Sequence, residues 1–542
     1  MDGYNRSSVY IAAQGPMPNT IADFWRMIWE YKIQHIVILT KCLEAGRRQK
    51  CGKACVWNHC GCIPLNPQPL FLLRKCEQYW ADNIGDVFET QDKKMEITTT
   101  SSMPFADFEI RTFNAKNTTA PDEKPLALTQ YHFTSWPDHG VPKFATSLIS
   151  FIRRVQKAHN KEDGVPLLVH CSAGVGRTGT FMLLDSMLER IKAEKTVNVY
   201  EFLTGLRRRR VLMVQTLPQY VFIHDALCEL ITCGETDIAA PALKVKIQRL
   251  SKVIPGKGVT GFQEQFQLLD QVSRKPEEDD CSEAREHYNR SKNRYADRLP
   301  YNLSRARLRP TGEDGSEYIN ASFLDGYKKR NAYIATQGPL LNTVGDFWRL
   351  MWEFKSKVMV MLCSLSEDGH EACHPFWPYD EGSTAKYGKI TVTLQTETSY
   401  DSFIQRKMLI QDDKAVQMGP GEGVVVTQFQ LPDWPEHGRP VSTGAVVEML
   451  DMITKAQMNT GNRAITILCN DGVGRTGTFI CLHSQLERLK TEGVVDFFQA
   501  VKSARIQRAG LVPDADQYAY CHEVLADFVN SYDNYANFKD VV

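Results

Sequence analysis

Short apolar runs alternate along the chain with stretches in which apolar residues recur at helical spacing. The runs at residues 166–169, 358–362 and 464–468 are almost entirely apolar, whereas the apolar residues within 180–188 are spaced as on one side of a helix. Short runs of this kind are typical of buried strands, and the second pattern is typical of an amphipathic helix. Strands that alternate with helices predict an α/β fold in both halves of the chain.

The chain also repeats itself, which divides it into two halves. Residues 10–16 recur as residues 333–339 at an offset of 323 (333 − 10), and residues 136–140 recur as residues 434–438 at an offset of 298 (434 − 136). At roughly 100 to 200 residues per domain the length fits two to four domains, and the repeat selects two. We therefore place domains at residues 1–231 and 244–531, a linker at 232–243 and a C-terminal tail at 532–542.

A glycine-rich loop joins the first predicted strand to the helix that follows it. The loop places Cys171 and Arg177 six residues apart, around Gly174, Gly176 and Gly179. A helix N-terminus offers free N–H groups to an anion, and the same field should stabilise a cysteine thiolate. A guanidinium can bind two phosphate oxygens at once. The loop therefore predicts a site for a phosphate dianion; the alternative is a buried cysteine in an ordinary turn, which would require these five residues to coincide.

Three further side chains could support a reaction at this loop. The Thr178 hydroxyl could hydrogen-bond the sulfur and ease its departure. Asp138 lies in a Trp-Pro-Asp-His-Gly turn, where it could protonate a leaving oxygen while Trp136 anchors a mobile loop. Gln215 could orient an attacking water. Each signal is weak alone, because a Trp-Pro-Asp turn is usually an ordinary surface turn.

Taken together, the loop, the Trp-Pro-Asp turn and the Gln215 segment resemble the classical protein tyrosine phosphatases. The tandem arrangement resembles the cytoplasmic part of a receptor-type member. The resemblance implies two phosphatase-like domains, each a twisted mixed sheet flanked by helices, and a reaction without metal or other cofactor. Further matching segments extend it over nearly the whole chain, at residues 10–16, 19–20, 23–25 and 78–80.

The resemblance also implies roles for individual residues of the first half, which would hydrolyse phosphotyrosine in proteins. Cys171 attacks phosphorus and Asp138 protonates the tyrosine oxygen. Asp138 and Gln215 then guide the water that hydrolyses the cysteinyl-phosphate. Arg177 holds the phosphoryl oxygens and is braced by Glu44. The other substrate-binding and supporting residues are Ser172, Ala173, Gly174, Val175, Gly176 and His170.

The second copy of the loop has lost several of these residues. Cys469 and Arg475 remain, but Asp471 should repel a phosphate dianion, and Pro513 cannot orient a water through a side-chain amide. We therefore interpret the second half as a pseudophosphatase with a regulatory, scaffolding or redox-sensing role. The alternative for the whole chain is a catalytically silent phosphotyrosine-binding or scaffolding protein. The replacements relative to the first half are His170 to Leu468, Ser172 to Asn470, Ala173 to Asp471, Asp138 to Glu436 and Gln215 to Pro513.

The first half lacks a counterpart of one segment of the second half. Met1 aligns with Leu324 (324 − 1 = 323), so nothing in the first half corresponds to residues 292–295 and 318–322. By resemblance, residues 292–295 carry the tyrosine that stacks on the substrate ring. We expect an uncovered sheet edge, weaker substrate selection and lower stability in the first half.

The first half also carries extra residues. The offset falls from 323 at Gln14 to 297 at Trp80 (377 − 80), a difference of 26 residues (323 − 297). We interpret residues 49–74 as foreign text that forms a disordered loop and could loosen the bracing of Arg177 by Glu44. A zinc site is the alternative, but the cysteine spacing matches no common zinc finger. The ligand-type residues are Cys51, Cys55, His59, Cys60 and Cys62.

Composition narrows the location and the partners. The 64 Lys and Arg residues balance 64 Asp and Glu residues, which gives no argument for nucleic acid. The arginine run at residues 207–210 is interpreted as a solvated helix end. No apolar stretch of about 18 residues exists, and the N-terminus lacks a secretory signal. Fifteen scattered cysteines suit a reducing compartment. We expect a cytoplasmic chain, on the inner face of the plasma membrane if the parent is receptor-type.

A short motif near the C-terminus suggests one more partner. Residues 533–538, Asp-Asn-Tyr-Ala-Asn-Phe, resemble the tail of one receptor phosphatase subgroup. Phosphorylated Tyr535 followed by Asn537 would suit the phosphotyrosine-reading domain of an adaptor protein. The alternative is an ordinary exposed aromatic tail.

Overall fold

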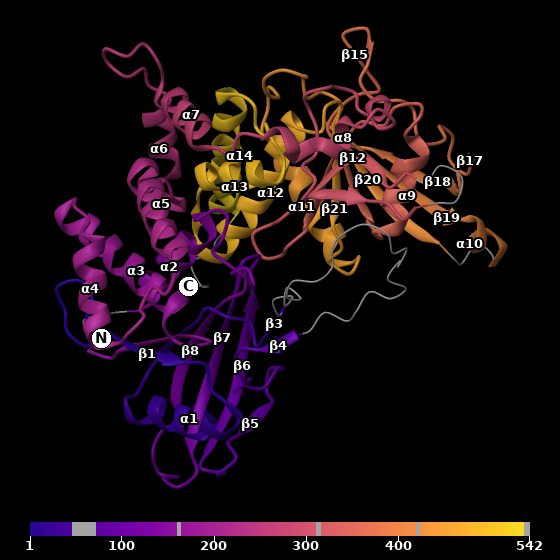
Figure 1. Cartoon of the computed structure of the whole chain (residues 1–542). Coiled ribbons are helices and arrows are strands. Elements are labelled where there is room, and N and C mark those ends of the chain that lie inside the picture. Colours follow the sequence, from indigo (N-terminus) through magenta and orange to yellow (C-terminus); the bar gives the residue numbers. More distant parts are fainter. Residues whose placement is uncertain (46–71, 160–163, 311–315, 419–422, 536–542) are drawn as a thin grey trace, which may run out of the picture. The chain divides into compact units, whose positions relative to one another are not determined.

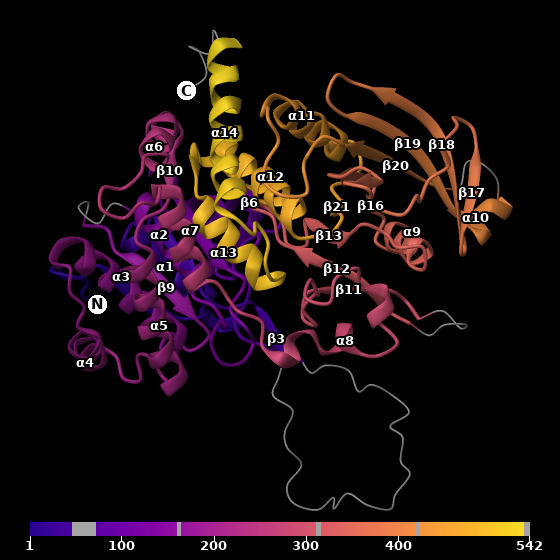
Figure 2. The same cartoon turned by 90° about the horizontal axis from the view of Figure 1, so that it is seen from above.

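The structure is a computed structural model that describes residues 1–45, 72–159, 164–310, 316–418 and 423–535. The described chain forms two compact units, Met1–Gly234 and Glu235–Val542. Each unit contains one large mixed sheet with helices packed on it (Figure 1, Figure 2). The predicted α/β fold is therefore confirmed in both halves.

The first unit is built on a seven-stranded sheet in the order β1-β9-β2-β8-β7-β6-β5. Neighbours from β1 to β8 are parallel, and neighbours from β8 to β5 are antiparallel. The sheet strands and a separate hairpin are β1 (Tyr10–Gln14), β2 (His35–Ile38), β5 (Val87–Glu89), β6 (Met95–Pro104), β7 (Phe108–Asn117), β8 (Leu126–Phe133) and β9 (Leu167–Cys171), with β3 (Leu43–Ala45) paired to β4 (Leu72–Arg74).

Helices cover both faces of this sheet because its buried strands are apolar on both sides. In β2, Val37 packs with the helices of one face, while Ile36 and Ile38 pack with α1 on the other. The apolar residues of α1 include Trp25 and Ile28, which lie on its buried side. Helices α2, α3 and α5 contribute to the core on the opposite face. The helices are η1 (Pro18–Thr20), α1 (Ile21–Glu30), α2 (Thr146–Ala158), α3 (Gly176–Glu194), α4 (Val199–Arg209) and α5 (Leu217–Cys233).

The β3–β4 hairpin shows where the extra residues of the first half enter. Glu44 pairs with Leu73, just as Glu367 of the second unit pairs with His370. Leu72–Arg74 are predicted to belong to the insertion, but they form the second strand of the hairpin. Residues 46–71 lie outside the described residues. The expected disordered loop and the alternative zinc site at the cysteines therefore also lie outside them.

The second unit has a larger sheet of nine strands, in the order β11-β12-β13-β21-β14-β20-β19-β18-β17. Its strand β13 corresponds to β1 and is paired on both sides, with β12 and β21. Within the described part of the chain, β1 pairs only with β9. The strands are β11 (Arg305–Arg307), β12 (Tyr318–Leu324), β13 (Tyr333–Gln337), β14 (Val358–Met361), β15 (Ser366–Glu367), β16 (His370–Glu371), β17 (Thr384–Tyr387), β18 (Ile390–Ser399), β19 (Ile404–Asp412), β20 (Val424–Gln430), β21 (Ile465–Cys469) and β22 (Val494–Val495).

Helices of the second unit pack on its sheet and on each other. Phe347 and Trp348 of α9 join the core formed with Met359 and Met361 of β14. Helix α14 packs against α12 and α13, which lie beside it in both views (Figure 1, Figure 2). The helices are η3 (Ala240–Ala242), α6 (Leu243–Leu250), α7 (Gly261–Val272), η4 (Glu278–Cys281), α8 (Ser282–Arg285), η5 (Arg290–Lys292), α9 (Val344–Glu353), α10 (Asp413–Met418), α11 (Gly444–Met458), α12 (Gly474–Glu492), α13 (Phe497–Gln507) and α14 (Ala515–Tyr535).

The segment between the two predicted domains is largely ordered. Helix α5 continues to Cys233, and β10 (Ile238–Ala239) pairs with β22 of the second unit. The Ala240 amide donates to the Gly493 carbonyl oxygen at 2.9 Å. The last residues of the expected linker are thus part of the second unit. Among the described residues, no helix combines the length and the hydropathy needed to span a bilayer.

Candidate active site

The candidate active site of the first unit forms where β9 ends and α3 begins. β9 is buried along its length and runs to Cys171, while α3 begins at Gly176. The connecting loop, residues 172–175, therefore faces the free amides of a helix N-terminus, which favour an anion. The Gly15 amide donates to the Ser172 carbonyl oxygen at 2.9 Å, and this bond fixes the loop beside the end of β1.

Gly174 allows the loop to contact β1 closely. Its φ of 71° lies in the left-handed region that favours glycine. A Cβ at this position would lie 2.2 Å from the Ala13 carbonyl oxygen, so a larger residue would displace the loop. The Gly174 amide donates to Sγ of the buried Cys171 at 3.3 Å. Of the other predicted substrate-binding residues, Ser172 and Val175 are half-buried and Ala173 is exposed.

Arg177 is held by a carboxylate and two backbone carbonyls. Its Nη1 and Nη2 donate to the two carboxylate oxygens of Glu44 at 2.5 and 3.0 Å. Further bonds go to the Leu39 oxygen at 3.1 Å and the Pro137 oxygen at 3.3 Å. Glu44 is buried and also accepts a hydrogen bond from the Thr40 hydroxyl at 2.8 Å. The expectation that the extra residues loosen this bracing is wrong, because the β3–β4 hairpin keeps Glu44 in register.

The predicted contact of the Thr178 hydroxyl with the sulfur is absent. Thr178 is fully buried, and none of the residues that the structure describes forms a hydrogen bond with its Oγ1. The Cys171 sulfur accepts from the Gly174 amide. In the second unit the equivalent hydroxyl of Thr476 does donate to Cys469 Sγ, at 3.1 Å.

His170 supports the loop from inside the sheet. It is fully buried, its Nδ1 lies 3.2 Å from the Cys171 carbonyl oxygen, and its Nε2 lies 2.9 Å from the Tyr79 hydroxyl. Because a carbonyl only accepts, Nδ1 carries the proton and Nε2 accepts from Tyr79. Burial lowers the pKa of His170 to about 4, so the ring is neutral at physiological pH.

Asp138 lies in a loop that is tied to Arg177. The loop follows β8, and its Trp136 is buried, with Nε1 donating to the Gly140 carbonyl oxygen at 3.2 Å. Arg177 binds the backbone oxygen of Pro137 and lies 5.7 Å from the centre of the Trp136 ring. Asp138 itself is half-buried. Trp136 therefore anchors the loop, and the loop carries the predicted acid, Asp138, directly after the residue whose carbonyl oxygen binds Arg177.

Gln215 is exposed and lies just before α5. Its position depends on Gln219, a residue that the sequence analysis did not predict to be part of the site. Its backbone amide donates to Gln219 Oε1 at 2.9 Å. Gln219 is buried against the loop, since a Cβ on Gly176 would lie 2.9 Å from Gln219 Nε2. Two features of the sequence could have indicated Gln219. It lies four residues after Gln215 at the start of a predicted helix, and a glutamine recurs at the equivalent position of the second half, Gln517 (517 − 219 = 298).

Two of the arginines interpreted as a solvated helix end make structural contacts. Arg207 donates through Nε to the Met213 oxygen at 2.9 Å and through Nη2 to the Val214 oxygen at 2.8 Å. Arg210 Nη2 donates to the Ala173 oxygen at 3.2 Å. Arg207, Arg208 and Arg209 are exposed in the last turn of α4, as the interpretation expected, whereas Arg210 follows the helix and is half-buried against the loop.

In the second unit a carboxylate occupies the corresponding loop. Asp471 Oδ1 accepts from the amides of Val473 and Gly474 at 2.8 and 3.2 Å and from the Cys469 thiol at 3.1 Å. The amides that would face a bound anion are therefore used within the loop itself. Burial and the Asp471 carboxylate raise the pKa of Cys469 to about 11, so its thiol is protonated at neutral pH.

Two other residues of the second loop, Asn470 and Arg475, also form hydrogen bonds with side chains of the second unit. Arg475 is buried, donates to both carboxylate oxygens of Glu367 at 2.6 and 2.8 Å, and binds the Trp434 oxygen at 2.8 Å. The Asn470 amide donates to Glu436 Oε1 at 2.5 Å. Glu436 is the counterpart of the acid in the first unit, and here it is tied to the loop.

Comparison with known proteins assigns the family. The family model described as protein-tyrosine phosphatase matches residues 1–59, 65–229 and 289–527, which is most of the chain. The chain therefore belongs to the protein-tyrosine phosphatase family, a family of enzymes, and the match to both halves agrees with tandem phosphatase-like domains.

Several receptor-type members of the family are similar over 99% of this chain. Human receptor-type tyrosine-protein phosphatase F is 40% identical over 538 residues, which are 26% of its length. Phosphatase S of Gallus gallus is 40% identical over 33% of its length, and phosphatase alpha of Mus musculus is 38% identical over 61%. The receptor-type resemblance is thus confirmed, and the chain spans only part of each of these relatives.

Proposed function

We propose that the first unit hydrolyses phosphotyrosine in proteins through a cysteinyl-phosphate intermediate. The observation that carries this proposal is the arrangement of Cys171 and Arg177 at one helix N-terminus. The sulfur of Cys171 accepts an amide hydrogen bond. The guanidinium of Arg177 is oriented by two hydrogen bonds, one to each carboxylate oxygen of Glu44. This arrangement suits in-line attack on a phosphoryl group whose oxygens face the loop amides and the arginine.

The reaction then has two steps, and each step includes one proton transfer that involves Asp138. The Cys171 thiolate forms a bond to phosphorus as the bond to the tyrosine oxygen breaks, and Asp138 gives that oxygen its proton. Asp138, now a carboxylate, takes a proton from a water positioned by Gln215. The water oxygen bonds to phosphorus, inorganic phosphate forms, and Cys171 leaves as a thiolate. Arg177 binds the phosphoryl oxygens in both steps.

We include in this proposal that the second unit is a pseudophosphatase. The Asp471 carboxylate takes the loop amides, the Cys469 thiol is protonated, and Pro513 stands in place of Gln215. A substrate phosphate would have to displace Asp471 and then lie close to it in a buried site. This supports a regulatory or scaffolding role for the unit.

Turnover of a phosphotyrosine peptide by the full chain tests both parts. Cys171→Ser should remove all measurable turnover, because serine at this position is a far poorer nucleophile. The matched variant Cys469→Ser should leave kcat/KM unchanged. Turnover that survives Cys171→Ser and disappears with Cys469→Ser would overturn the assignment of both units.

The alternative is a chain that binds phosphotyrosine without hydrolysing it. The observation in its favour is that, within the part of the chain that the structure describes, β1 pairs with a strand on one side only, whereas β13 pairs on both sides. This alternative predicts saturable binding of a phosphotyrosine peptide, sensitive to Arg177→Ala, with no release of inorganic phosphate. Measurable phosphate release that requires Cys171 rejects it.

The proposal has two further parts, of which the first is supported by the names of the relatives and the second by the motif at residues 533–538. Since they are receptor-type, we place this chain on the cytoplasmic face of a membrane as part of a receptor-type parent. Tyr535 is the last residue of α14, and we assign it as a phosphorylation site read by an adaptor. A phosphorylated peptide of residues 530–542 should retain an isolated phosphotyrosine-binding adaptor domain, and the unphosphorylated peptide should not.

A further inference from the structure

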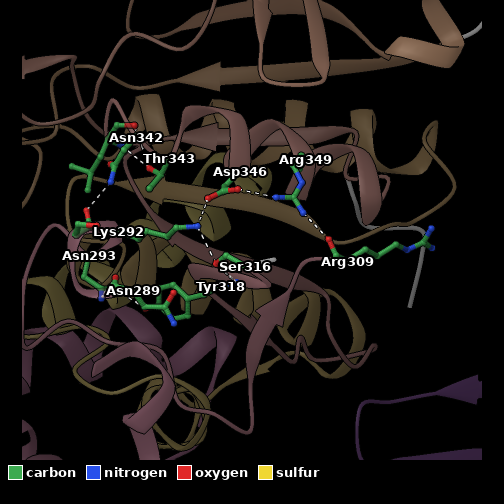
Figure 3. Close-up of polar contacts among 12 residues, drawn as sticks. Asn289, Lys292, Asn293, Arg309, Ser316, Tyr318, Asn342, Thr343, Asp346 and Arg349 are labelled. Carbon is green, nitrogen blue, oxygen red and sulfur yellow. Dashed lines mark hydrogen bonds and ion pairs between the residues drawn. The ribbon is translucent and has the colours of Figure 1, made fainter. Parts of the chain in front are cut away.

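Polar side chains that are buried away from the two loops can serve the fold alone, as one network of the second unit shows. Lys292 Nζ donates to Asp346 Oδ2 at 2.8 Å and to Ser316 Oγ at 3.1 Å (Figure 3). Arg349 donates to Asp346 Oδ1 at 2.9 Å and to the Arg309 carbonyl oxygen at 2.7 Å. These bonds fix the chain on both sides of β11 against α9. The first unit contains a pair of buried groups of a different kind, because both are thiols.

The thiols of Cys42 and Cys76 lie in contact at the base of the β3–β4 hairpin. The Lys75 amide donates to the Cys42 carbonyl oxygen at 2.8 Å, which continues the register in which Leu43 pairs with Arg74. This register brings the two cysteines together, and a hydrogen bond joins their thiols. Both are free cysteines. Two sulfur atoms in contact form a disulfide once they approach to about 2 Å.

The two thiols differ in reactivity. Cys42 is half-buried and can be reached from solvent, whereas Cys76 is only 4% exposed. The hydrogen bond from Cys76 lowers the pKa of Cys42, and the charges of Arg111 and Arg74 act in the same direction, against burial and the Glu77 carboxylate. The same hydrogen bond and burial raise the pKa of Cys76. Cys76 Sγ also lies 3.1 Å from the Glu77 carbonyl oxygen, but a thiolate is the stronger acceptor. Since the thiolate is the nucleophile, Cys42 should react first with an electrophile.

Cys76 also lies close to the backbone of the first loop. A Cβ on Gly15 would lie 3.1 Å from Cys76 Sγ and 2.8 Å from the Cys171 carbonyl oxygen. The sulfur of Cys171, however, accepts from the Gly174 amide. The thiol in contact with Cys76 is therefore that of Cys42.

We propose that Cys42 and Cys76 are a modification site of the first unit, at which a hydroperoxide converts the two thiols into a reversible disulfide. The disulfide would tie the strand that carries Glu44 to the chain that follows β4. It would also close residues 43–75 into a loop, which restricts the unfolded chain and stabilises the folded unit. The modification requires no turnover, so it can be measured whether or not the first unit hydrolyses phosphotyrosine.

The reaction has two steps. The Cys42 thiolate attacks one peroxide oxygen, the O–O bond breaks, and the leaving oxygen takes a proton to become water or an alcohol. Cys42 is then a sulfenic acid. The Cys76 sulfur attacks the Cys42 sulfur, the S–O bond breaks, and the hydroxyl leaves as water with the proton of Cys76. The pair of thiols loses a pair of electrons, and the peroxide gains them.

The second unit contains only half of this pair, which makes it an internal control. Leu365 is the counterpart of Cys42 (365 − 42 = 323), and Cys373 is the counterpart of Cys76 (373 − 76 = 297). The Cys373 amide donates to the Leu365 carbonyl oxygen at 3.1 Å, so the two positions are adjacent here as well. Cys373 and Cys363 are fully buried, and burial raises the pKa of each. Neither offers an accessible thiolate, and both should stay reduced.

The test uses the full chain with Cys171→Ser, because this substitution removes the predicted nucleophile of the candidate active site. The reduced chain is treated with hydrogen peroxide, its remaining thiols are alkylated in denaturant, and it is digested with trypsin without reduction. Trypsin releases Cys42 in residues 42–47 and Cys76 in residues 76–93, each as the only cysteine of its peptide. Mass spectrometry should find these two peptides linked, and a reductant should separate them.

Single substitutions in this chain assign the role of each thiol. Cys42→Ser should abolish the linked peptide and leave Cys76 as a thiol. Cys76→Ser should abolish it as well but leave Cys42 as a sulfenic acid that dimedone traps, because the resolving thiol is gone. Cys228→Ser replaces an exposed cysteine of α5 and is the control, which should leave the yield unchanged.

Other patterns of oxidation would overturn the inference. A link that forms only in chains that retain Cys171 would show that peroxide acts first on Cys171. A link from Cys42 or Cys76 to any other cysteine would show that their contact does not select the partner. Oxidation of Cys373 to the same extent as Cys42 would show that the pair is not needed for reactivity. Persistence of both thiols after peroxide treatment would exclude the modification itself.

Discussion

At the scale of single residues, Glu44 is the group on which the orientation of Arg177 depends. Glu44→Gln keeps the shape of the side chain but replaces a charged bidentate acceptor by one neutral acceptor. We expect kcat/KM for a phosphotyrosine peptide to fall roughly 10- to 100-fold, which corresponds to about 1.5–3 kcal/mol for a charge-assisted contact. The matched control is Glu367→Gln, which alters the same bracing of Arg475. Parent-like kcat/KM in Glu44→Gln would contradict the bracing role.

His170 gives the first unit a predictable dependence on pH. Its pKa is about 4 in the folded chain, below the value of 6.5 expected when unfolded. Between these two values the unfolded state binds more protons, so His170 does not affect the stability above pH 6.5 and causes a loss of stability that grows as the pH falls toward 4. Its full size is about 3 kcal/mol.

Urea unfolding at pH 7 and pH 4.5 measures this dependence. His170→Gln should reduce the loss of unfolding free energy between the two pH values by about 2 kcal/mol or more relative to the parent chain. His224→Gln, which replaces an exposed histidine of the same unit, is the control and should behave as the parent does. An equal pH dependence in all three chains would show that His170 is not titrating as the structure implies.

At the scale of elements, the β3–β4 hairpin predicts that most of the extra residues are dispensable. In the second unit, Asp368 and Gly369 connect the equivalent strands with φ values of 47° and 78°, as in a type I′ turn. Replacement of residues 46–71 by Asp-Gly should leave kcat/KM within about threefold, because Glu44 is held by strand pairing and Thr40. A shorter connection should also raise the unfolding free energy by about 2 kcal/mol. Loss of turnover in a folded variant would show that the replaced residues contribute to the site.

The same elements show what the sequence can predict. The buried strand before Cys171 and the helix after it follow from local apolar patterns, and the repeat locates a second copy of each. Contacts made by tertiary approach could not be predicted in this way. Among the described residues Thr178 has no hydrogen-bond partner, and the Cys171 sulfur accepts from the Gly174 amide, which the loop brings close to it. Gln219 and Arg210 reach the loop only because α4 and α5 converge there, and neither carries a local signal of that contact.

At the scale of the whole molecule, the two units should differ in stability. Among the described residues of the first unit, β1 pairs with one strand, β9, and Ile11 and Ala13 are only half-buried. The equivalent β13 is paired on both sides and its Ile334 is fully buried. Because fewer apolar groups are removed from water around β1, we expect calorimetry to show two transitions, with the first unit unfolding at the lower temperature.

Inorganic phosphate should raise the temperature of one of these two transitions and leave the other unchanged. At about 100 times its Kd, phosphate stabilises a site by about 2.7 kcal/mol, which raises Tm by roughly 5–10 °C for a unit of this size. Only the lower transition should move in the parent chain, because the Asp471 carboxylate already takes the loop amides of the second unit. Asp471→Ala frees those amides and should let phosphate raise the upper transition as well. Sodium chloride at equal ionic strength is the control, and equal shifts of both transitions in the parent chain would show that Asp471 does not close the second site.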